Sequence, residues 1–298
     1  MYIVTFKSRR IAFAILLQYA FASYCLAKDI LFVTSGTSPS YDNFYQLYQA
    51  DIGPRVPVTQ VLYSEVSKPV LDDHSLILTV GNRAATHINE FQTRNPVIHT
   101  FITREFYKNV AEPGCKNECY GVYLDQPFER YLKFIHTIFK KEKSIILPVN
   151  KISVTYNKQA AQYKIPVKQI VISNEDNISK RLSRELKSNN VLLALPNPDI
   201  YNRSSAKAII LTTYHKNIPI IAYSKSFANA GAIASLYSSI NDVATMSAEL
   251  STNLLNNIKI KPGGYYPASY SIELNENVAR SLNIELPTHQ QLYEALQK

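Results

Sequence analysis

Hydrophobic positions in this chain form short apolar runs that alternate with amphipathic stretches, most clearly over residues 191–235. Residues 191–195 are an apolar run ended by two prolines, a pattern typical of a strand buried on both faces. A helical stripe follows over 206–213, and residues 218–223 form a second apolar run. Strand, polar loop, helix and strand predict a βαβ unit with parallel strands and a right-handed crossover.

The same alternation extends over most of the chain and predicts parallel sheets covered by helices. Further strands are expected at 30–35, 59–63, 76–80, 97–102, 144–149, 169–173 and 271–274. Further helices are expected near 41–48, 83–91, 128–139, 153–163, 178–186, 243–254, 276–282 and 288–296. Residues 104–127 break this pattern with proline, glycine and cysteine, and we expect them to connect two lobes.

The amino terminus has the features of a secretory signal over residues 1–27. Lys7, Arg9 and Arg10 precede an apolar run, and small residues favour cleavage after Ala27. A lipoprotein acylated on Cys25 and an uncleaved anchor are the alternatives. We expect a mature protein in the periplasm, with 298 − 27 = 271 residues.

A chain of this length exceeds one ordinary hydrophobic core, so we expect two lobes. Residues 28–124 are assigned to lobe 1, with a return over about 231–260, and 125–230 to lobe 2. Residues 261–298 are placed near the hinge or lobe 2. The expected fold class is α/β, with two doubly wound parallel-sheet lobes joined by a hinge.

Charge and cysteine content add limits on partners and redox chemistry. Loss of the signal lowers the formal net charge from +9 to +6, and the remaining charge is spread along the chain. This distribution argues against a nucleic-acid partner. Cys115 and Cys119 favour a disulfide in an oxidising compartment, worth about 2 kcal/mol on the chain-entropy model. A metal site and a redox-active pair are weaker alternatives.

Catalytic motifs are missing from the sequence. It holds no P-loop, no G-x-G-x-x-G, no H-E-x-x-H and no G-x-S-x-G, and its six histidines are scattered. We therefore expect a monomeric binding protein without catalytic residues, cofactor or metal. Its partner is expected to be a small-molecule ligand.

In doubly wound sheets, ligands bind beyond the carboxyl ends of the strands. Polar residues at those ends make up the candidate ligand-binding set: Ser35, Gly36, Thr37, Gly81, Asn82, Arg83, Asn150, Asn197, Asp199, Tyr201 and Ser224. Ser35 and Asn82 are assigned to a carboxylate, Asp199 to an ammonium group and Tyr201 to ring stacking. Turn formation by Gly81 and Asp199, and helix capping by Asn82, are equally compatible with these residue types.

Three stretches resemble the ABC-transporter substrate-binding protein family that includes tryptophan- and tyrosine-binding types. They are Tyr120-Gly121-Val122 leading through the helix at 128–139 to SIILPVN, the stretch 191–235 ending in GAIAS, and SIELNENVARSLNIEL at 271–286. The resemblance implies a type I periplasmic binding protein fold, with the ligand between two lobes that close about a hinge. Residues 241–246 and 196–199 depart from the family pattern, which leaves the identity of the ligand open.

The function expected from these features is periplasmic capture of a small polar or amino-acid-like ligand. An ABC permease is the partner that the resemblance implies. Two alternatives remain at this stage: a ligand-sensing module that docks on a membrane sensor, and an exported enzyme on the same scaffold.

Overall fold

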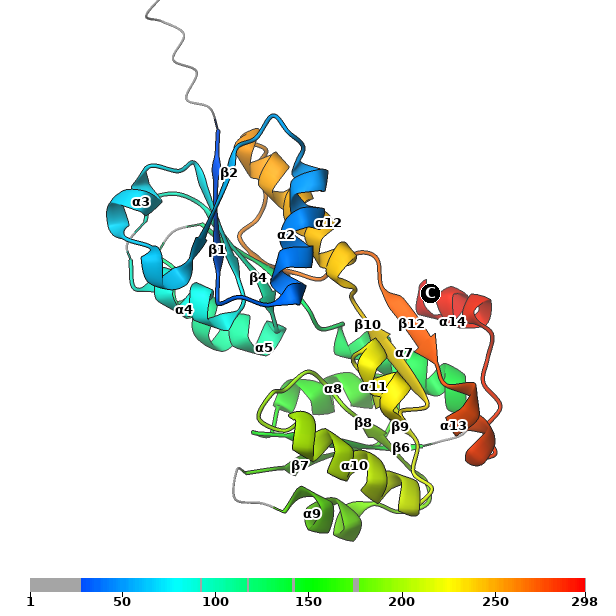
Figure 1. Ribbon diagram of the computed structural model, residues 1–298. Helices are drawn as coiled ribbons and strands as arrows, with labels where there is room; N and C mark the ends of the chain where they lie inside the picture. Colours follow the sequence, from blue (N-terminus) through cyan, green and yellow to red (C-terminus); the bar gives the residue numbers. More distant parts are fainter. Residues whose placement is uncertain (1–27, 92, 117, 141–142, 174–176, 298) are drawn as a thin grey trace, which may run out of the picture.

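The computed structural model describes residues 28–297 apart from 92, 117, 141–142 and 174–176, and it shows two lobes (Figure 1). Each lobe contains one six-stranded sheet with helices on both faces. A separate hydrophobic cluster lies on each face of each sheet, so both strand layers are buried on two sides. The expected fold class is therefore confirmed, while the expected signal at 1–27 lies outside the described residues.

Lobe 1 is built on a sheet with the strand order β11-β5-β4-β3-β1-β2, in which every pairing is parallel. Its elements are β1 (Ile30–Thr34), α2 (Pro39–Ile52), β2 (Val58–Leu62), η1 (Tyr63–Glu65), α3 (Lys68–Asp72), β3 (Leu76–Val80), α4 (Asn82–Asn89), β4 (Val97–Ile102), α5 (Arg104–Phe106), η2 (Tyr107–Ala111), α6 (Glu112–Gly114), β5 (Cys119–Tyr123), α12 (Ile240–Leu255) and β11 (Gly263–Tyr265).

Lobe 2 repeats this order as β12-β10-β9-β8-β6-β7, with only β12 antiparallel among these strands. Its elements are α7 (Phe128–Phe139), β6 (Ser144–Val149), α8 (Val154–Gln162), β7 (Val167–Val171), α9 (Ile178–Glu185), β8 (Asn190–Leu193), α10 (Arg203–His215), β9 (Ile220–Ala222), α11 (Lys225–Ala230), β10 (Ala234–Tyr237), β12 (Ser271–Leu274), α13 (Glu276–Ser281) and α14 (His289–Gln297).

The chain passes between the lobes three times: from β5 to α7, from β10 to α12, and from β11 to β12. The return to lobe 1 starts later than the expected residue 231, because β10 pairs with β9 and β12 in the second sheet. Ala234 and Leu236 face the lobe 2 core, which holds this strand there. Residues 240–265 then complete lobe 1 through α12 and β11, and the C-terminal segment from β12 onward belongs to lobe 2.

Residues 104–127 are more than the connection that their composition predicts. They include the short helical turns α5, η2 and α6, and also β5, which lies inside the sheet between β4 and β11. Gly121 interrupts the hydrophobic run at this strand, so the pattern of apolar positions does not predict it. A Cβ built there would lie 2.6 Å from Cδ2 of Tyr107, so the ring of Tyr107 occupies the space that a side chain would need.

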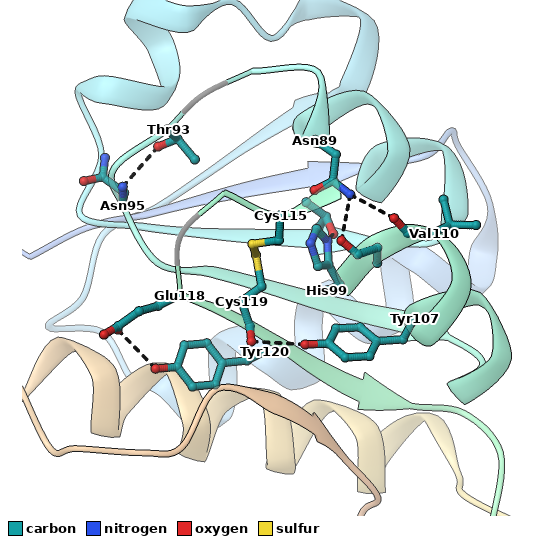
Figure 2. The surroundings of a disulfide bond; sticks show 12 residues. Asn89, Thr93, Asn95, His99, Tyr107, Val110, Cys115, Glu118, Cys119 and Tyr120 are labelled. Atoms are coloured by element: carbon teal, nitrogen blue, oxygen red, sulfur yellow. Dashed lines mark hydrogen bonds between the residues drawn. A yellow bond between two sulfur atoms is a disulfide. The ribbon is translucent and has the colours of Figure 1, made fainter. Parts of the chain in front are cut away.

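A disulfide joins Cys115 to Cys119, as the sequence predicts, and closes the loop between α6 and β5 (Figure 2). The segment before it has two further attachments. The hydroxyl of Tyr107 donates to the carbonyl oxygen of Cys119 at 3.1 Å, and Asn89 Nδ2 donates to the carbonyl oxygen of Ala111 at 2.9 Å. Both ends of the 104–119 segment are thereby fixed to the body of lobe 1.

His99 on β4 is fully buried beneath this segment. Its Nδ1 lies 2.8 Å from Thr79 Oγ1, and burial lowers its pKa from 6.5 to about 4. Between pH 6.5 and 4 the unfolded chain therefore binds a proton that the folded protein does not. The expected result is that acidification over this range lowers the free energy of unfolding by about 3 kcal/mol through His99 alone.

Denaturation curves of wild type and His99→Gln between pH 7.5 and 4 measure this contribution as the difference in pH slope. The exposed His289 gives a matched control, because His289→Gln is expected to keep the wild-type slope. Equal slopes for wild type and His99→Gln would contradict the assignment of a neutral, buried imidazole.

Candidate functional site

A cleft of about 480 Å³ opens between the lobes, a volume typical of small-molecule sites. Lobe 1 contributes residues that follow β4, and lobe 2 contributes the loops after β6 and β8 and the start of α8. The crossing segments form the back of the cleft. The lining consists of Thr103, Arg104, Glu105, Lys108 and Asn109 from lobe 1, Asp125, Gln126, Pro127 and Tyr266 from the crossings, and Phe128, Glu129, Pro148, Val149, Asn150, Lys151, Ile152, Ser153, Thr155, Tyr156, Gln159, Leu195, Pro196 and Asn197 from lobe 2.

Asp125 is the acidic group at the back of the cleft, just beyond β5. Burial raises its pKa from 3.8 to about 6, although its Oδ1 accepts a hydrogen bond of 2.8 Å from the backbone N–H of Arg104. The nearby Arg104 side chain lowers the pKa by less than burial raises it. At neutral pH the carboxylate is ionised in a place where its charge is poorly solvated, so a cation beside it would be stabilising.

The start of α8, on the lobe 2 wall of the cleft, favours an anion, in contrast to the cation that Asp125 favours. Ser153 is the N-cap of this nine-residue helix, and within the described chain its side chain makes no capping hydrogen bond. Gln169 fixes the cap residue instead, since its Oε1 accepts from the Ser153 backbone N–H and its Nε2 donates to the Ser153 carbonyl, both at 2.8 Å. The first-turn N–H groups and the positive end of the helix dipole favour an anion here.

Aromatic rings also line the cleft. Phe128 and Tyr156 lie with their ring centroids 4.5 Å apart, and Tyr266 contacts Tyr123 edge-on at 4.9 Å. Burial raises the pKa of Tyr156 to about 12 and that of Tyr266 still further, so both phenols are neutral at physiological pH. These rings offer flat apolar surface with hydroxyl groups at the edge.

The three crossing segments are tied together by a group of side chains that we call the hinge clasp: Gln126, Arg130, Ser238 and Tyr270. Gln126 Nε2 donates to Ser238 Oγ at 2.5 Å, which joins the first crossing to the second. Arg130 Nη1 donates to Gln126 Oε1, and the Arg130 guanidinium lies 4.4 Å from the ring centroid of Tyr270 on the third crossing. The clasp therefore fixes the lobe 2 ends of all three crossings relative to one another.

Two residues of the predicted site, Asn150 and Asn197, line the cleft. Asp199 is outside the lining but is hydrogen-bonded to both. Asn150 Nδ2 donates to Asp199 Oδ2 at 2.8 Å, and Asn197 Oδ1 accepts from the Asp199 backbone N–H at 3.0 Å. The structure thus brings three predicted residues together where the loops after β6 and β8 meet.

The predicted residues of lobe 1 lie outside the cleft lining, at the carboxyl ends of β1 and β3. Ser35 is buried; its Oγ donates to the Val80 carbonyl at 2.7 Å and accepts from the Ala84 N–H at 2.9 Å. Gly81 has φ +87° and lies so close to Ser35 and Tyr41 that a side chain would not fit, so a glycine is needed at this turn. The others in this region are Gly36, Thr37, Asn82 and Arg83, of which Thr37, Asn82 and Arg83 are exposed.

Two predicted residues of lobe 2 also lie away from the cleft lining. Ser224 caps α11, accepting from the Phe227 N–H at 3.2 Å. Tyr201 is only 7% exposed and packs edge-on against Tyr223 and Phe227, so its ring is already enclosed by protein. Its stacking on a ligand, like ligand contact by Ser35, stays a prediction.

Sequence reasoning missed Asp125, Tyr156 and Tyr266, whereas Arg104 lies at a strand end, the kind of position that the sequence rule indicates. Arg104 and Asp125 both fall in the stretch interpreted as a connection, and the lining residues after β4 and β5 come from its two ends. The usable signal was Leu124-Asp125-Gln126, a polar turn directly after a short apolar stretch. Across the described residues, no cluster of three or more histidines, cysteines or acids is placed to hold a metal ion.

Neither the family models nor the curated proteins that were compared with this chain give a match. Solved structures match its fold. A substrate-binding protein with adhesive properties from Clostridium difficile, in its ligand-free, open form, has a TM-score of 0.68 at 17% identity, covering 89% of this chain and 97% of that one.

Two other solved structures match over a similar extent. An ABC domain in complex with L-Trp from Streptococcus pneumonia has a TM-score of 0.61 at 15% identity, covering 89% of this chain and 97% of its own. A conserved domain protein from Vibrio cholerae has a TM-score of 0.60 at 15% identity, covering 90% and 98%.

The chain has a two-lobed α/β fold consistent with the type I periplasmic binding protein class of folds, with a cleft between the lobes. Within that class, the fold resembles that of ABC-transporter solute-binding proteins, so the resemblance expected from the sequence is confirmed for the fold. In the part of the chain that the structure describes, no helix has the length and apolarity needed to span a bilayer.

Proposed function

We propose that this protein is an exported solute-binding protein that captures an amino-acid-like zwitterion in the interlobe cleft and delivers it to an ABC importer. The observation that carries the proposal is Asp125, a carboxylate with its pKa raised to about 6 at the back of the cleft. A ligand ammonium group beside it would offset the poor solvation of its charge.

The ligand carboxylate is assigned to the first turn of α8. The N-cap residue Ser153 and the first-turn residues Thr155 and Tyr156 line the cleft. A negative charge here meets free N–H groups and the positive helix end. Opposite charges of the ligand would thus be held by different walls of one cleft.

The ring surfaces of Phe128, Tyr156 and Tyr266 support a flat side chain on the ligand. The streptococcal protein of the same fold binds L-Trp in its solved structure, which agrees with a ligand of this size. The mature protein's export rests on the expected signal at residues 1–27, and the Cys115–Cys119 disulfide is in keeping with an oxidising compartment. An importer partner is inferred from a solute-binding protein of an ABC transporter that shares the fold.

The direct test is native mass spectrometry of the purified mature protein, followed by calorimetry with each of the twenty common L-amino acids. The expected result is 1:1 binding of at least one of them. At a hundredfold excess over Kd, that ligand should raise the free energy of unfolding by about 2.7 kcal/mol. No binding or stabilisation by any amino acid would contradict the proposed ligand class.

Asn150→Ala tests the lobe 2 wall of the same site. It removes a cleft side chain and its hydrogen bond to Asp199, and we expect affinity for the bound amino acid to fall about tenfold, equivalent to about 1.4 kcal/mol. Asn82→Ala is the informative comparison, because the sequence assigns Asn82 to the ligand carboxylate whereas its position is outside the cleft lining. Unchanged affinity in Asn150→Ala would contradict this wall of the site.

A further inference from the structure

Strand β4 departs from regular geometry at Phe101, three residues before Arg104. Thr100 pairs with Val122 on β5, an offset of 122 − 100 = 22 positions, whereas Ile102 pairs with Tyr123, an offset of 123 − 102 = 21. Phe101 is therefore one extra residue in β4, a β-bulge, which re-aims the strand beyond it. Its φ is +59°, in the left-handed region that a bulky side chain rarely adopts.

Packing on α2 holds Phe101 in this conformation. Its ring lies edge-on to Phe44 and Tyr41, with centroids 5.1 Å and 5.6 Å away. Thr100 faces the same side of the sheet, where its Oγ1 accepts a hydrogen bond of 3.2 Å from a serine of α12. Ile102 packs on the opposite face, in the cluster beside η2. Backbone strain that is held by surrounding contacts in this way is concentrated at functional sites.

The shift of one residue decides which side chain enters the cleft opposite Asp125. The offset of 21 that begins at Ile102 gives Arg104 as the residue opposite Asp125, since 125 − 104 = 21. The Arg104 N–H donates to Asp125 Oδ1 at 2.8 Å, and the Leu124 N–H donates to the Ile102 carbonyl at 2.9 Å, so the shifted register continues to this point. With the earlier offset of 22, Thr103 would take the place of Arg104.

We propose that Phe101 is a positioning residue of the cleft, because the bulge that it forms places Arg104, and not Thr103, opposite Asp125. Phe101 is absent from the cleft lining, so it acts through the backbone of β4. The consequence for ligand affinity rests on the proposed function, since Asp125 is the residue assigned to the ligand ammonium group. The placement of Arg104 does not.

Three substitutions at Phe101 separate backbone conformation from packing of the ring. Glycine and asparagine adopt positive φ, whereas β-branched valine strongly disfavours it. All three lose the ring contacts with α2, and asparagine fills the apolar site less well than valine. Phe101→Gly and Phe101→Asn should therefore keep the bulge, while Phe101→Val should move Arg104 away from Asp125. A residue that only fills the core would give the reverse order, with valine tolerated best.

Titration of the Asp125 carboxyl by NMR, without any ligand, measures this placement. The Arg104 N–H and charge lower a pKa that burial and the charge of Glu105 raise, with a result of about 6. The expected result is a higher pKa of Asp125 in Phe101→Val and the wild-type value in Phe101→Gly and Phe101→Asn. Asn217→Val is the matched control, because it places valine at φ +54° in the turn between α10 and β9, which contributes no described residue to the cleft lining.

An unchanged pKa of Asp125 in Phe101→Val would overturn the proposal, as would an equal rise in Phe101→Gly and Phe101→Asn. If Phe101→Val does not fold, Phe101→Ala takes its place, since it differs from Phe101→Gly by one methyl group and has the same conflict with positive φ in a milder form.

Calorimetry with the twenty L-amino acids at pH 7.5 gives the second measurement. Phe101→Val should weaken binding of the cognate amino acid about tenfold, whereas Phe101→Gly and Phe101→Asn should stay within about threefold of wild type. Equal losses in the three variants, or the smallest loss in Phe101→Val, would overturn the role of Phe101 in affinity. If no amino acid binds the wild type, the proposed function fails and the titration of Asp125 alone decides for or against the placement.

Discussion

Asp125→Asn is expected to weaken binding of the cognate amino acid about a hundredfold, the largest effect of any single substitution in the cleft. The change removes the charge but keeps an oxygen that accepts from the Arg104 N–H. Losing one partner of a poorly solvated charge pair costs about 2–5 kcal/mol, which corresponds to at least thirtyfold in Kd. Calorimetry at pH 7.5 measures this loss directly.

The same substitution is expected to stabilise the protein without ligand. The pKa of Asp125 is raised from 3.8 to about 6, so the folded state holds its proton more tightly than the unfolded chain does; stability is lost as pH rises from 3.8 to 6, and the full cost of the ionised carboxylate is present above pH 6. A neutral asparagine at this position would remove that cost, raising the free energy of unfolding at pH 7.5 by about 1–2 kcal/mol. Below pH 6, protonation of Asp125 should reduce wild-type affinity about tenfold per pH unit, and Asp125→Asn should lack this dependence.

Glu129→Gln is the matched control for charge, because Glu129 is another acid in the cleft lining. We expect it to change affinity far less than Asp125→Asn and to keep the fall in affinity below pH 6. If both variants bind alike, or if Asp125→Asn binds as wild type does, the ammonium site is not at Asp125.

Gly121→Ala should have the largest effect on stability, lowering the free energy of unfolding by about 3 kcal/mol. A methyl group on β5 would lie 2.6 to 3.0 Å from three ring atoms of the buried Tyr107. Because these are atoms of the ring body, relief requires movement of Tyr107 and of η2 with it. Chemical denaturation monitored by circular dichroism measures the change.

Gly36→Ala is the control for this substitution. A Cβ at Gly36 meets nothing within 4 Å, so we expect a change within about 0.5 kcal/mol. Tyr107→Leu in the Gly121→Ala background should recover part of the lost stability, since it removes the overlapping ring. Stability of Gly121→Ala equal to that of Gly36→Ala would contradict the tight packing of β5 against Tyr107.

Alternation of apolar runs and amphipathic stretches was sufficient to predict the class of fold and most of the sheet strands. This pattern failed where a tertiary contact, and not local periodicity, determines which residue a strand position needs. β5 carries Gly121 because Tyr107 needs the space, and a glycine between Tyr120 and Val122 interrupts the apolar signal. β10 was assigned to a return segment because a strand of four residues carries too little pattern to reveal which sheet it joins.

The site was predicted less completely, for a geometric reason. Strand ends are visible in sequence, and on lobe 2 they led to Asn150 and Asn197 in the cleft. On lobe 1 the candidate set came from the ends of β1 and β3, whereas the cleft uses Thr103 and Arg104 at the end of β4 and residues beyond β5, nearer the crossings. Which strand ends meet across two lobes depends on their relative orientation, which periodicity does not encode.

The hinge clasp has a mechanical consequence for the proposed capture of a ligand. Gln126, Arg130, Ser238 and Tyr270 join the crossings at their lobe 2 ends, so we expect bending to occur mainly in the residues on the lobe 1 side of the clasp. Asp125 is one of those residues and therefore sits near the axis of rotation, where displacement is smallest. A guest anchored by its ammonium group at the pivot would keep that contact throughout the swing, while the first turn of α8, on a longer lever arm, would arrive last.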